Sequence, residues 1–152
     1  MADLTHRSGA VLTAGAVALL AIIAAVPTAR ANHDDPAALC NGKFRGHFEY
    51  RWSLPINSRR TGVQLGRVAI SADQLVGQRR RVCAVTIRRF HKRRRFTSIK
   101  IKRSGDAKWR KNASYLYRRY AGPVVRSNPD GTCVEFVGRI AGGVPVKSSY
   151  CY

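Results

Sequence analysis

The chain has 152 residues and a formal net charge of +20, because 28 lysines and arginines are set against eight carboxylates. An excess of this size indicates an anionic partner, such as a nucleic acid, a membrane surface or another polyanion. The length excludes a multidomain protein, since the part that follows the N-terminal apolar segment is enough for one hydrophobic core.

Residues 1–31 are predicted to be a secretory signal peptide. An apolar run of Ala, Val, Leu, Ile and Gly occupies Ala10–Val26 behind Arg7. Ala29-Arg30-Ala31 then provides the small-residue pattern at which signal peptides are cleaved. An uncleaved signal anchor is the alternative, but the apolar run is barely long enough to span a bilayer.

Cleavage after Ala31 leaves a secreted chain with 26 basic and seven acidic side chains. The polar residues 32–39 are expected to form a flexible leader at its N-terminus. Residues 40–152 are predicted to form a single disulfide-stabilised β domain.

Four cysteines lie in this secreted part, namely Cys40, Cys83, Cys133 and Cys151. An even number in a small exported domain predicts two disulfides, and no Cys/His spacing indicates zinc or another metal. Three pairings are possible. The sequence favours Cys133–Cys151, because both cysteines are equally distant from Gly142 in the turn of a predicted hairpin. Cys40 is then left to pair with Cys83.

Short segments of alternating polarity follow the leader and predict strands. The first, Lys43–Trp52, has aromatic residues on one face and precedes a loop over Leu54–Gly62. The second is Val63–Ser71, in which a change of parity near Gly66 indicates a bulge. A turn over Ala72–Gln78 leads into the next segment.

The segment Arg79–Arg119 carries 17 lysines and arginines but a single carboxylate, Asp106. Within it, Val82–Ile87 and Thr97–Ile101 have the alternation and the residue types of strands. We therefore predict a cationic β-hairpin with its tip at His91–Arg95. Like charges on paired strands repel one another, so an anion is expected to offset the repulsion.

The remaining residues complete an all-β pattern, without a sustained helical period. The expected elements are a turn at Ser104-Gly105-Asp106, a strand over Ser114–Tyr120 bent by Ala121-Gly122-Pro123, a turn at Asn128–Gly131, and two strands, Thr132–Ile140 and Val144–Tyr152, joined by a Gly-Gly turn. The predicted fold is a compact antiparallel β-sandwich or a partly open β-barrel with two disulfides.

Val82-Cys83-Ala84-Val85-Thr86-Ile87-Arg88 resembles the Cys-Val-Val-Thr-Ile-Arg strand of the spore-associated protein A family, small secreted proteins of Streptomyces and related actinobacteria. Tyr120-Ala121-Gly122-Pro123-Val124 and Gly131–Phe136 are similar to further blocks of that family, as are Trp109 and Tyr117. The resemblance implies an extracellular or spore-surface protein with no established catalytic residues. The chain departs from the family at the polycationic His91–Arg95 and at Phe136-Val137, which replaces Trp-Gly.

We predict a non-catalytic protein that binds anionic polymers outside the cell, namely wall teichoic acid, nucleic acid or anionic lipid. Arginine forks pair with phosphates, and aromatic rings offer stacking faces. The predicted polyanion-binding residues are Arg88, Arg89, Lys92, Arg93, Arg94 and Arg95. The neighbouring aromatic residues are Phe90, Phe96, Trp109, Tyr115 and Tyr117. Peripheral contact with a membrane is compatible with this prediction, and no cofactor is expected.

Three alternatives use the same features differently. A small secreted hydrolase such as a ribonuclease would use His47, Glu49 and His91 as a general acid–base set, although no ribonuclease motif surrounds them. A cationic antimicrobial protein would disturb anionic membranes, but the predicted hairpin lacks a continuous apolar face for insertion. A purely structural coat protein would adhere to a spore or cell wall through its charge and its exposed strand edges.

Overall fold

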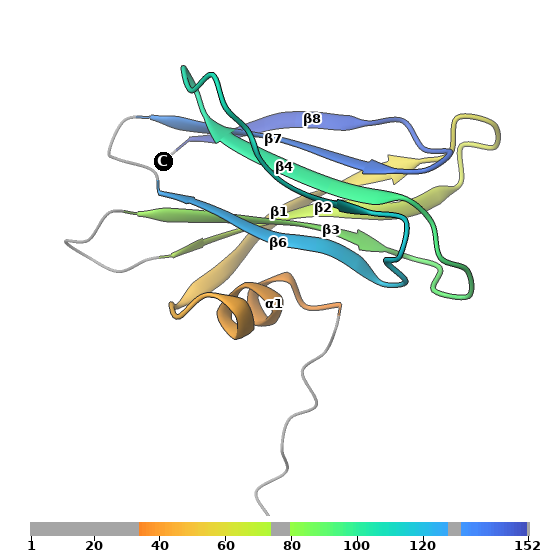
Figure 1. Cartoon of the computed structure of the whole chain (residues 1–152), viewed down its shortest axis with the longest axis horizontal. Coiled ribbons are helices and arrows are strands. Elements are labelled where there is room, and N and C mark those ends of the chain that lie inside the picture. Colours follow the sequence, from red (N-terminus) through yellow and green to blue (C-terminus); the bar gives the residue numbers. More distant parts are fainter. Residues whose placement is uncertain (1–33, 74–79, 128–131, 152) are drawn as a thin grey trace, which may run out of the picture.

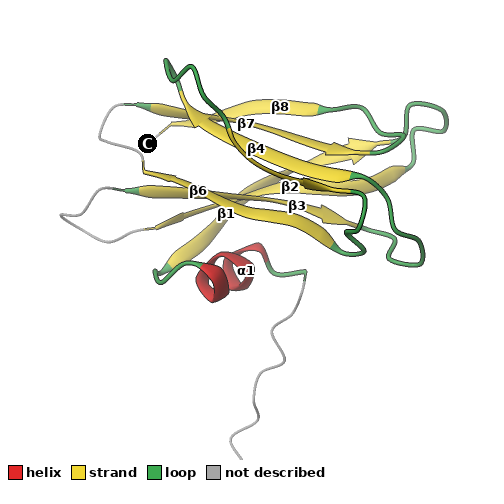
Figure 2. Ribbon diagram, in the orientation of Figure 1, coloured by secondary structure: helices red, strands yellow, loops and turns green. Residues whose placement is uncertain are grey.

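The computed structural model describes residues 34–73, 80–127 and 132–151. They form the helix α1 (Pro36–Lys43) and the strands β1 (Phe48–Asn57), β2 (Gln64–Asp73), β3 (Arg81–Arg88), β4 (Thr97–Arg103), β5 (Arg110–Ser114), β6 (Tyr120–Ser127), β7 (Cys133–Ile140) and β8 (Val146–Cys151). One antiparallel sheet has the order β1-β2-β3-β6 and the other the order β5-β4-β7-β8. Figure 1 and Figure 2 show the two sheets packed as layers, with α1 outside the first. The predicted antiparallel β-sandwich is confirmed.

The main hydrophobic core lies between the two sheets, where alternate side chains of facing strands meet. Phe136 of β7 is its largest fully buried side chain, and its ring centroid lies 5.4 Å from that of Trp52 on β1. The buried members of this core are Ile56, Val68, Ile70, Val82, Ala84, Ile99, Ile101, Ala121, Val124, Val134, Phe136 and Ile140.

Strand β3 is buried on both faces. Val82 and Ala84 lie in the main core, whereas Cys83 and Val85 lie in a second cluster on the outer side of the sheet. Helix α1 packs on this outer side, and its Cys40 belongs to the same cluster. This is why nearly every residue of β3 is buried, instead of every second one.

Both predicted disulfides are confirmed, Cys40–Cys83 and Cys133–Cys151. Cys133 and Cys151 are direct partners in the register of β7 and β8, and Gly142 takes a positive φ of 82° in the turn between these strands. Cys40 joins α1 to the outer face of β3. The two bonds therefore close one sheet edge and attach the helix.

The predicted flexible leader is wrong for residues 36–39, which begin helix α1. The side chain of Asp35 caps the helix by accepting hydrogen bonds from the N–H groups of Ala37 and Ala38, at 2.9 and 3.3 Å. Pro36 occupies the first turn, where no N–H donor is needed. A helix of eight residues is too short to display an apolar period, which explains why the sequence pattern did not predict it. Leader residues 32 and 33 lie outside the described part of the chain.

The first strand begins and ends later than predicted. Helix α1 extends to Lys43, and β1 runs from Phe48 to Asn57 through part of the predicted loop. Pro55 is tolerated within β1 because this strand is at the edge of its sheet, where one side of the backbone needs no partner.

The predicted cationic hairpin is wrong. Strand β3 pairs with β2 and β6, whereas β4 pairs with β5 and β7, so the two strands belong to different sheets. Residues 89–96, which we call the crossover, pass from one sheet to the other (Figure 1). Each strand already has a neighbour on both edges, and the crossover contains no glycine for a tight hairpin turn.

The predicted strand over Ser114–Tyr120 is also wrong, because β5 ends at Ser114 and β6 begins at Tyr120. The Ser114 hydroxyl accepts a hydrogen bond of 3.0 Å from the N–H of Leu116, and such a local bond favours a turn. The bulge near Gly66 is confirmed, since the pairing of β1 with β2 skips Leu65. Of the predicted turn over Ala72–Gln78, residues 72 and 73 belong instead to β2, and residues 74–78 lie outside the described part of the chain. The predicted turn at 128–131 lies outside it as well.

Gly138 of β7 marks a point of close approach between the sheets. A Cβ atom at this position would collide with the Val68 and Thr86 side chains of the opposite sheet. We expect Gly138→Ala to lower the free energy of unfolding by about 1–3 kcal/mol, measured by denaturant titration with the disulfides intact. Gly42→Ala is the matched control, since the space around Gly42 in α1 is open and alanine favours a helix. Equal midpoints for Gly138→Ala and the parent chain would contradict the packing.

The turn after β4 predicts a pH dependence of stability. Asp106 accepts hydrogen bonds from the backbone N–H and the Nε of Arg103, and ion pairs with Arg103 and Arg126 at 3.3 and 3.5 Å. The side-chain hydrogen bond from Arg103 is the main reason that the pKa of Asp106 is lowered in the folded state. The stabilisation is therefore present above the unfolded pKa of about 3.9 and is lost as the pH falls through the lower folded pKa.

We expect Asp106→Asn to lower the melting temperature at neutral pH, because the ion pairs with Arg103 and Arg126 are lost. The difference from the parent chain should shrink as the pH falls from about 5 to about 2, since the parent carboxylate then becomes protonated as well. Thermal melts over this range measure both trends. A difference that stays constant down to pH 2 would contradict the role of the carboxylate charge.

Candidate functional site

Four loops meet at one end of the sandwich. They follow the odd-numbered strands and occupy residues 58–63, 89–96, 115–119 and 141–145. Because neighbouring strands are antiparallel, the connections that follow β1, β3, β5 and β7 emerge at the same end, as Figure 1 shows. We call these four loops the basic loop end.

Backbone hydrogen bonds join the loops of the basic loop end to one another or to adjoining strands. The N–H of Arg59 donates to the carbonyl of Gly142 at 3.0 Å, which links the first and fourth loops. The N–H of Ala141 donates to the carbonyl of Phe96 at 2.9 Å, which links the fourth loop to the crossover. The N–H of Arg88, at the end of β3, donates to the carbonyl of Arg119 at 2.7 Å. The third loop is thereby held beside the crossover.

Exposed cations are concentrated at the basic loop end. Its four loops contain nine lysines and arginines, all exposed, and no aspartate or glutamate. They are Arg59, Arg60, Arg89, Lys92, Arg93, Arg94, Arg95, Arg118 and Arg119. A neighbouring carboxylate is that of Asp34, whose Oδ1 lies 4.0 Å from His91 Nε2. The strong positive potential expected of such a cluster would attract anions.

Five of the six predicted polyanion-binding residues are exposed in the crossover, whereas Arg88 is not. The Arg88 side chain is only 4% exposed, and it donates hydrogen bonds to the carbonyls of Tyr117 and Arg93 at 2.8 and 2.6 Å. Burial and the nearby charge of Arg95 both lower the pKa of its guanidinium. In this structure, Arg88 holds the crossover and the third loop together.

The sequence prediction omits the other arginines of the basic loop end, namely Arg59, Arg60, Arg118 and Arg119. Arg59 and Arg60 are about 30 residues away from the crossover in the chain, and Arg118 and Arg119 were assigned to a strand. Alternation of loop direction between successive strands is a signal that would have brought them together. The incorrect prediction of a hairpin obscures this alternation.

The predicted aromatic residues are divided between two places. Phe90, Phe96 and Tyr115 lie at the basic loop end, and the rings of Phe96 and Tyr115 are 4.8 Å apart. Trp109 lies before β5, with its ring centroid 4.5 Å from the Nζ of Lys100. Tyr117 packs against the main core, and its hydroxyl hydrogen-bonds to Asn112.

A second cationic surface lies on the outer face of the sheet β5-β4-β7-β8. Lys111 pairs with Lys100, which pairs with Val137, which pairs with Lys147, so three lysines form a row across four strands. We call Lys100, Lys111 and Lys147 the lysine row. Glu135, on the same sheet, lies 3.7 Å from Lys102 and partly offsets the positive charge there.

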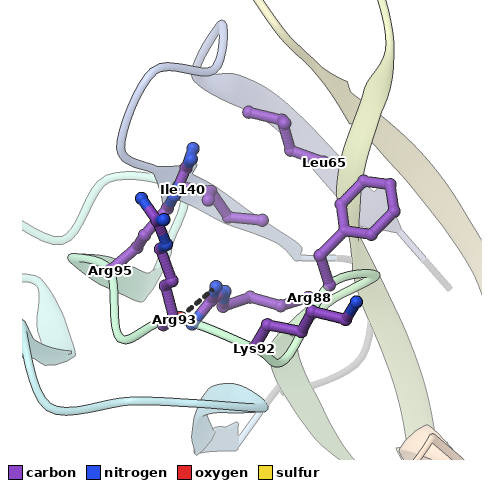
Figure 3. Close-up of a pocket in the computed structure, with 7 residues that line it drawn as sticks. Leu65, Arg88, Lys92, Arg93, Arg95 and Ile140 are labelled. Atoms are coloured by element: carbon purple, nitrogen blue, oxygen red, sulfur yellow. Dashed lines mark hydrogen bonds between the residues drawn. The ribbon is translucent and has the colours of Figure 1, made fainter.

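A cavity of about 270 Å³ opens between the crossover and the ends of the neighbouring strands. In the close-up view (Figure 3), Arg93 and Arg95 stand along one side, Leu65 lies on the other, and Arg88 crosses the base. The lining combines apolar and cationic side chains, namely Leu65, Phe90 and Ile140 with Arg88, Lys92, Arg93 and Arg95.

The three candidate catalytic residues are not brought together. His47 and Glu49 are exposed near the start of β1, where Glu49 pairs with Ala72 of β2. His91 lies in the crossover, beyond the end of β3 that pairs with Gly66. Ala72 and Gly66 are six residues apart along β2, which corresponds to about 20 Å in a strand.

Within the described ranges, no group of three or more His, Cys, Asp or Glu side chains is placed to hold a metal ion. No helix among these residues is long and apolar enough to cross a membrane. The two disulfides indicate an oxidising, extracellular environment.

In comparisons with known proteins, no protein family, curated protein or solved structure matches the chain.

The arrangement of Arg88 predicts a structural effect of its removal. We expect Arg88→Met to lower the free energy of unfolding by about 2–3 kcal/mol, because two carbonyls of the loops lose a charged donor. Arg89→Met is the matched control, since the Arg89 side chain is exposed and should change stability by less than about 0.5 kcal/mol. Denaturant titration of both variants measures the difference, and equal stabilities would contradict the role given to Arg88.

Proposed function

We propose that this chain is a secreted, strongly cationic protein that binds phosphate-rich anionic polymers at a cell or spore surface without catalysing a reaction. The basic loop end is the observation that carries this proposal. Nine exposed cations from three of the four loops lie at one end of the sandwich, and none of the four loops contributes a carboxylate. An anionic partner is the simplest reason to concentrate such charge.

Relief of repulsion within this cluster and the release of counterions from the polyanion would both favour binding. Nine like charges held at one end raise the energy of the free protein, and dissolved salt screens them only in part. A polyanion neutralises several of them at once and releases its own condensed counterions. Binding is therefore expected to be strong at low ionic strength and to weaken steeply as salt is added.

The chemistry of the cluster favours phosphate as the anionic group. Eight of the nine exposed residues are arginines, and Lys92 is the exception. A guanidinium presents a planar fork that matches two phosphate oxygens, whereas an ammonium acts as a point charge. Because these side chains are exposed, the contacts should follow the backbone of a polymer and should not read its sequence. Wall teichoic acid, nucleic acid and anionic lipid all present such phosphates.

Three features support secretion and a surface location. Residues 1–31 have the pattern of a signal peptide, and the two disulfides suit an oxidising compartment. The resemblance to the spore-associated protein A family favours a spore or cell surface.

A hydrolytic function has less support, since His91 lies at the opposite end of β2 from His47 and Glu49.

The proposal predicts a selective loss of binding. We expect Arg93→Ser/Arg94→Ser/Arg95→Ser to weaken binding to duplex DNA and to teichoic acid by about tenfold or more at 100 mM salt. The plot of log affinity against log salt concentration should become less steep by about 2–3, since about three phosphate contacts are lost. Titrations of each ligand over about 50–200 mM salt measure both quantities.

Lys100→Ser/Lys111→Ser/Lys147→Ser is the matched control. It also removes three positive charges, but from the lysine row on the outer face of a sheet, and it leaves the basic loop end intact. An equal loss of affinity in both triple variants would mean that net charge alone determines binding. No binding by the parent chain at any salt concentration would overturn the proposed function.

A further inference from the structure

Exposed apolar side chains gather at the same end as the cations. Of the six large hydrophobic side chains that are exposed in the described ranges, five lie in the loops of the basic loop end. Every one of the four loops contributes at least one. They are Val63, Phe90, Tyr115, Leu116 and Val144, with exposed fractions of 49, 51, 73, 67 and 49%.

This distribution distinguishes the basic loop end from an ordinary surface. Scattered single hydrophobic residues are common on soluble proteins, but several gathered in one place among cations indicate an interaction surface. A loop without such a role would be expected to carry polar residues at its tip. Tyr115 and Leu116 are consecutive, and both are more than two-thirds exposed.

We propose that the basic loop end docks on an anionic lipid bilayer, with the apolar tips of the loops inserted among the lipids and the arginines paired with the lipid phosphates. The proposal rests on the proposed function and names its partner. Duplex DNA or teichoic acid offers phosphates to the arginines but little apolar medium for Phe90, Tyr115 and Leu116. Unpaired bases could stack on the two rings, but they offer little to the aliphatic tip Leu116. The interfacial region of a bilayer offers both.

The chemistry of the exposed residues suits insertion into the interfacial region of the bilayer. Tyrosine has an apolar ring and a polar tip, and it is favoured at the level of lipid headgroups. Phenylalanine and leucine are apolar throughout and can pass slightly deeper. Long arginine side chains extend outward to the phosphates while their stems cover apolar surface. The positive charge attracts the protein to an anionic leaflet before the apolar contacts form.

The loops are held in positions that allow them to act together. The ring contact between Phe96 and Tyr115 joins the crossover to the third loop. The N–H of Val144 donates to the carbonyl of Asn57 at 2.9 Å, which holds the fourth loop beside the end of β1, where the first loop begins. The cavity in Figure 3 shows the same combination on a smaller scale, since Leu65 lies across it from Arg93 and Arg95, and Ile140 also lines it.

The lysine row provides an internal comparison. Val137, which lies between Lys100 and Lys147 in the register of the strands, is only 7% exposed. The ring of Trp109 lies against Lys100 and Lys102. None of the large exposed hydrophobic residues of the described chain lies on β4, β5, β7 or β8. This face therefore has charge without apolar tips, and it suits a hydrated polyanion better than a bilayer.

The test compares vesicles with a polymer that lacks an apolar phase. The parent chain and Phe90→Ser/Tyr115→Ser/Leu116→Ser are titrated with inorganic polyphosphate, with phosphatidylcholine vesicles, and with vesicles of equal parts phosphatidylglycerol and phosphatidylcholine. We expect the triple variant to bind the anionic vesicles about 100-fold more weakly and to bind polyphosphate as the parent does. Tyr50→Ser is the matched control, because Tyr50 is 47% exposed but lies on β1 near the other end of the sandwich.

A spectroscopic measurement reports insertion directly. The emission of the tryptophan introduced by Tyr115→Trp should shift to shorter wavelength when anionic vesicles are added. The emission of the tryptophan introduced by Tyr50→Trp should not shift. Leu116→Ser alone is a milder variant, should the triple variant fold poorly, and it should still weaken vesicle binding severalfold. Circular dichroism of each variant checks that the fold is retained.

Each outcome has a distinct meaning. Equal vesicle affinity of the parent chain and the serine variants, or no fluorescence shift of Tyr115→Trp, would overturn membrane docking and leave polymer binding in place. Binding of the parent chain to vesicles of phosphatidylcholine alone would overturn the role of the arginines. Binding to neither polyphosphate nor anionic vesicles would overturn the proposed function itself.

Discussion

The burial of β3 on both faces is the constraint on which the rest of the structure depends. Val82 and Ala84 need the second sheet on one side, and Cys83 and Val85 need helix α1 on the other. The two edges of β3 are paired with β2 and β6, so the segment that follows β3 finds no free edge of this strand to pair with. The chain must therefore leave β3, cross to the opposite sheet and begin β4 there, which produces the crossover at residues 89–96.

The crossover determines where the charge is concentrated. Once β4 lies in the second sheet, the connections after β1, β3, β5 and β7 share one end, and arginines far apart in the chain become neighbours. Their repulsion opposes folding, and the interactions that offset it lie away from the charged tips. The two-layer core, the disulfide Cys40–Cys83 and the hydrogen bonds of the buried Arg88 hold the loops together from beneath. The cations themselves remain exposed to solvent.

Features that depend on local pattern could be predicted from the sequence, whereas the pairing of strands from distant segments could not. The long-range disulfide Cys40–Cys83 was reached only by elimination, once Cys133 and Cys151 were paired. The Cys133–Cys151 pairing follows from equal distances to the Gly142 turn, and the all-β class follows from alternating polarity. The alternation in Val82–Ile87 and Thr97–Ile101 and the short link between them favour a hairpin, but alternation does not say which strands are neighbours. Helix α1 depends on contacts with β3, which no eight-residue pattern reveals. The basic loop end required the full topology, because its arginines come from three loops.

Charge alone does not account for the composition of the basic loop end. A surface that only attracts polymers gains little from exposed Leu116, since an apolar group in water adds a risk of aggregation without adding contacts to phosphates. Phe90 and Tyr115 would serve such a surface only where unpaired bases stack on their rings. Cations and apolar tips become mutually supportive only at a boundary that is anionic on one side and apolar on the other. In the proposed docking, the cations attract the protein to that boundary, and the apolar groups slow its dissociation. The residual affinity at high salt therefore depends on the apolar tips, because salt screens the arginines and leaves the hydrophobic contacts intact.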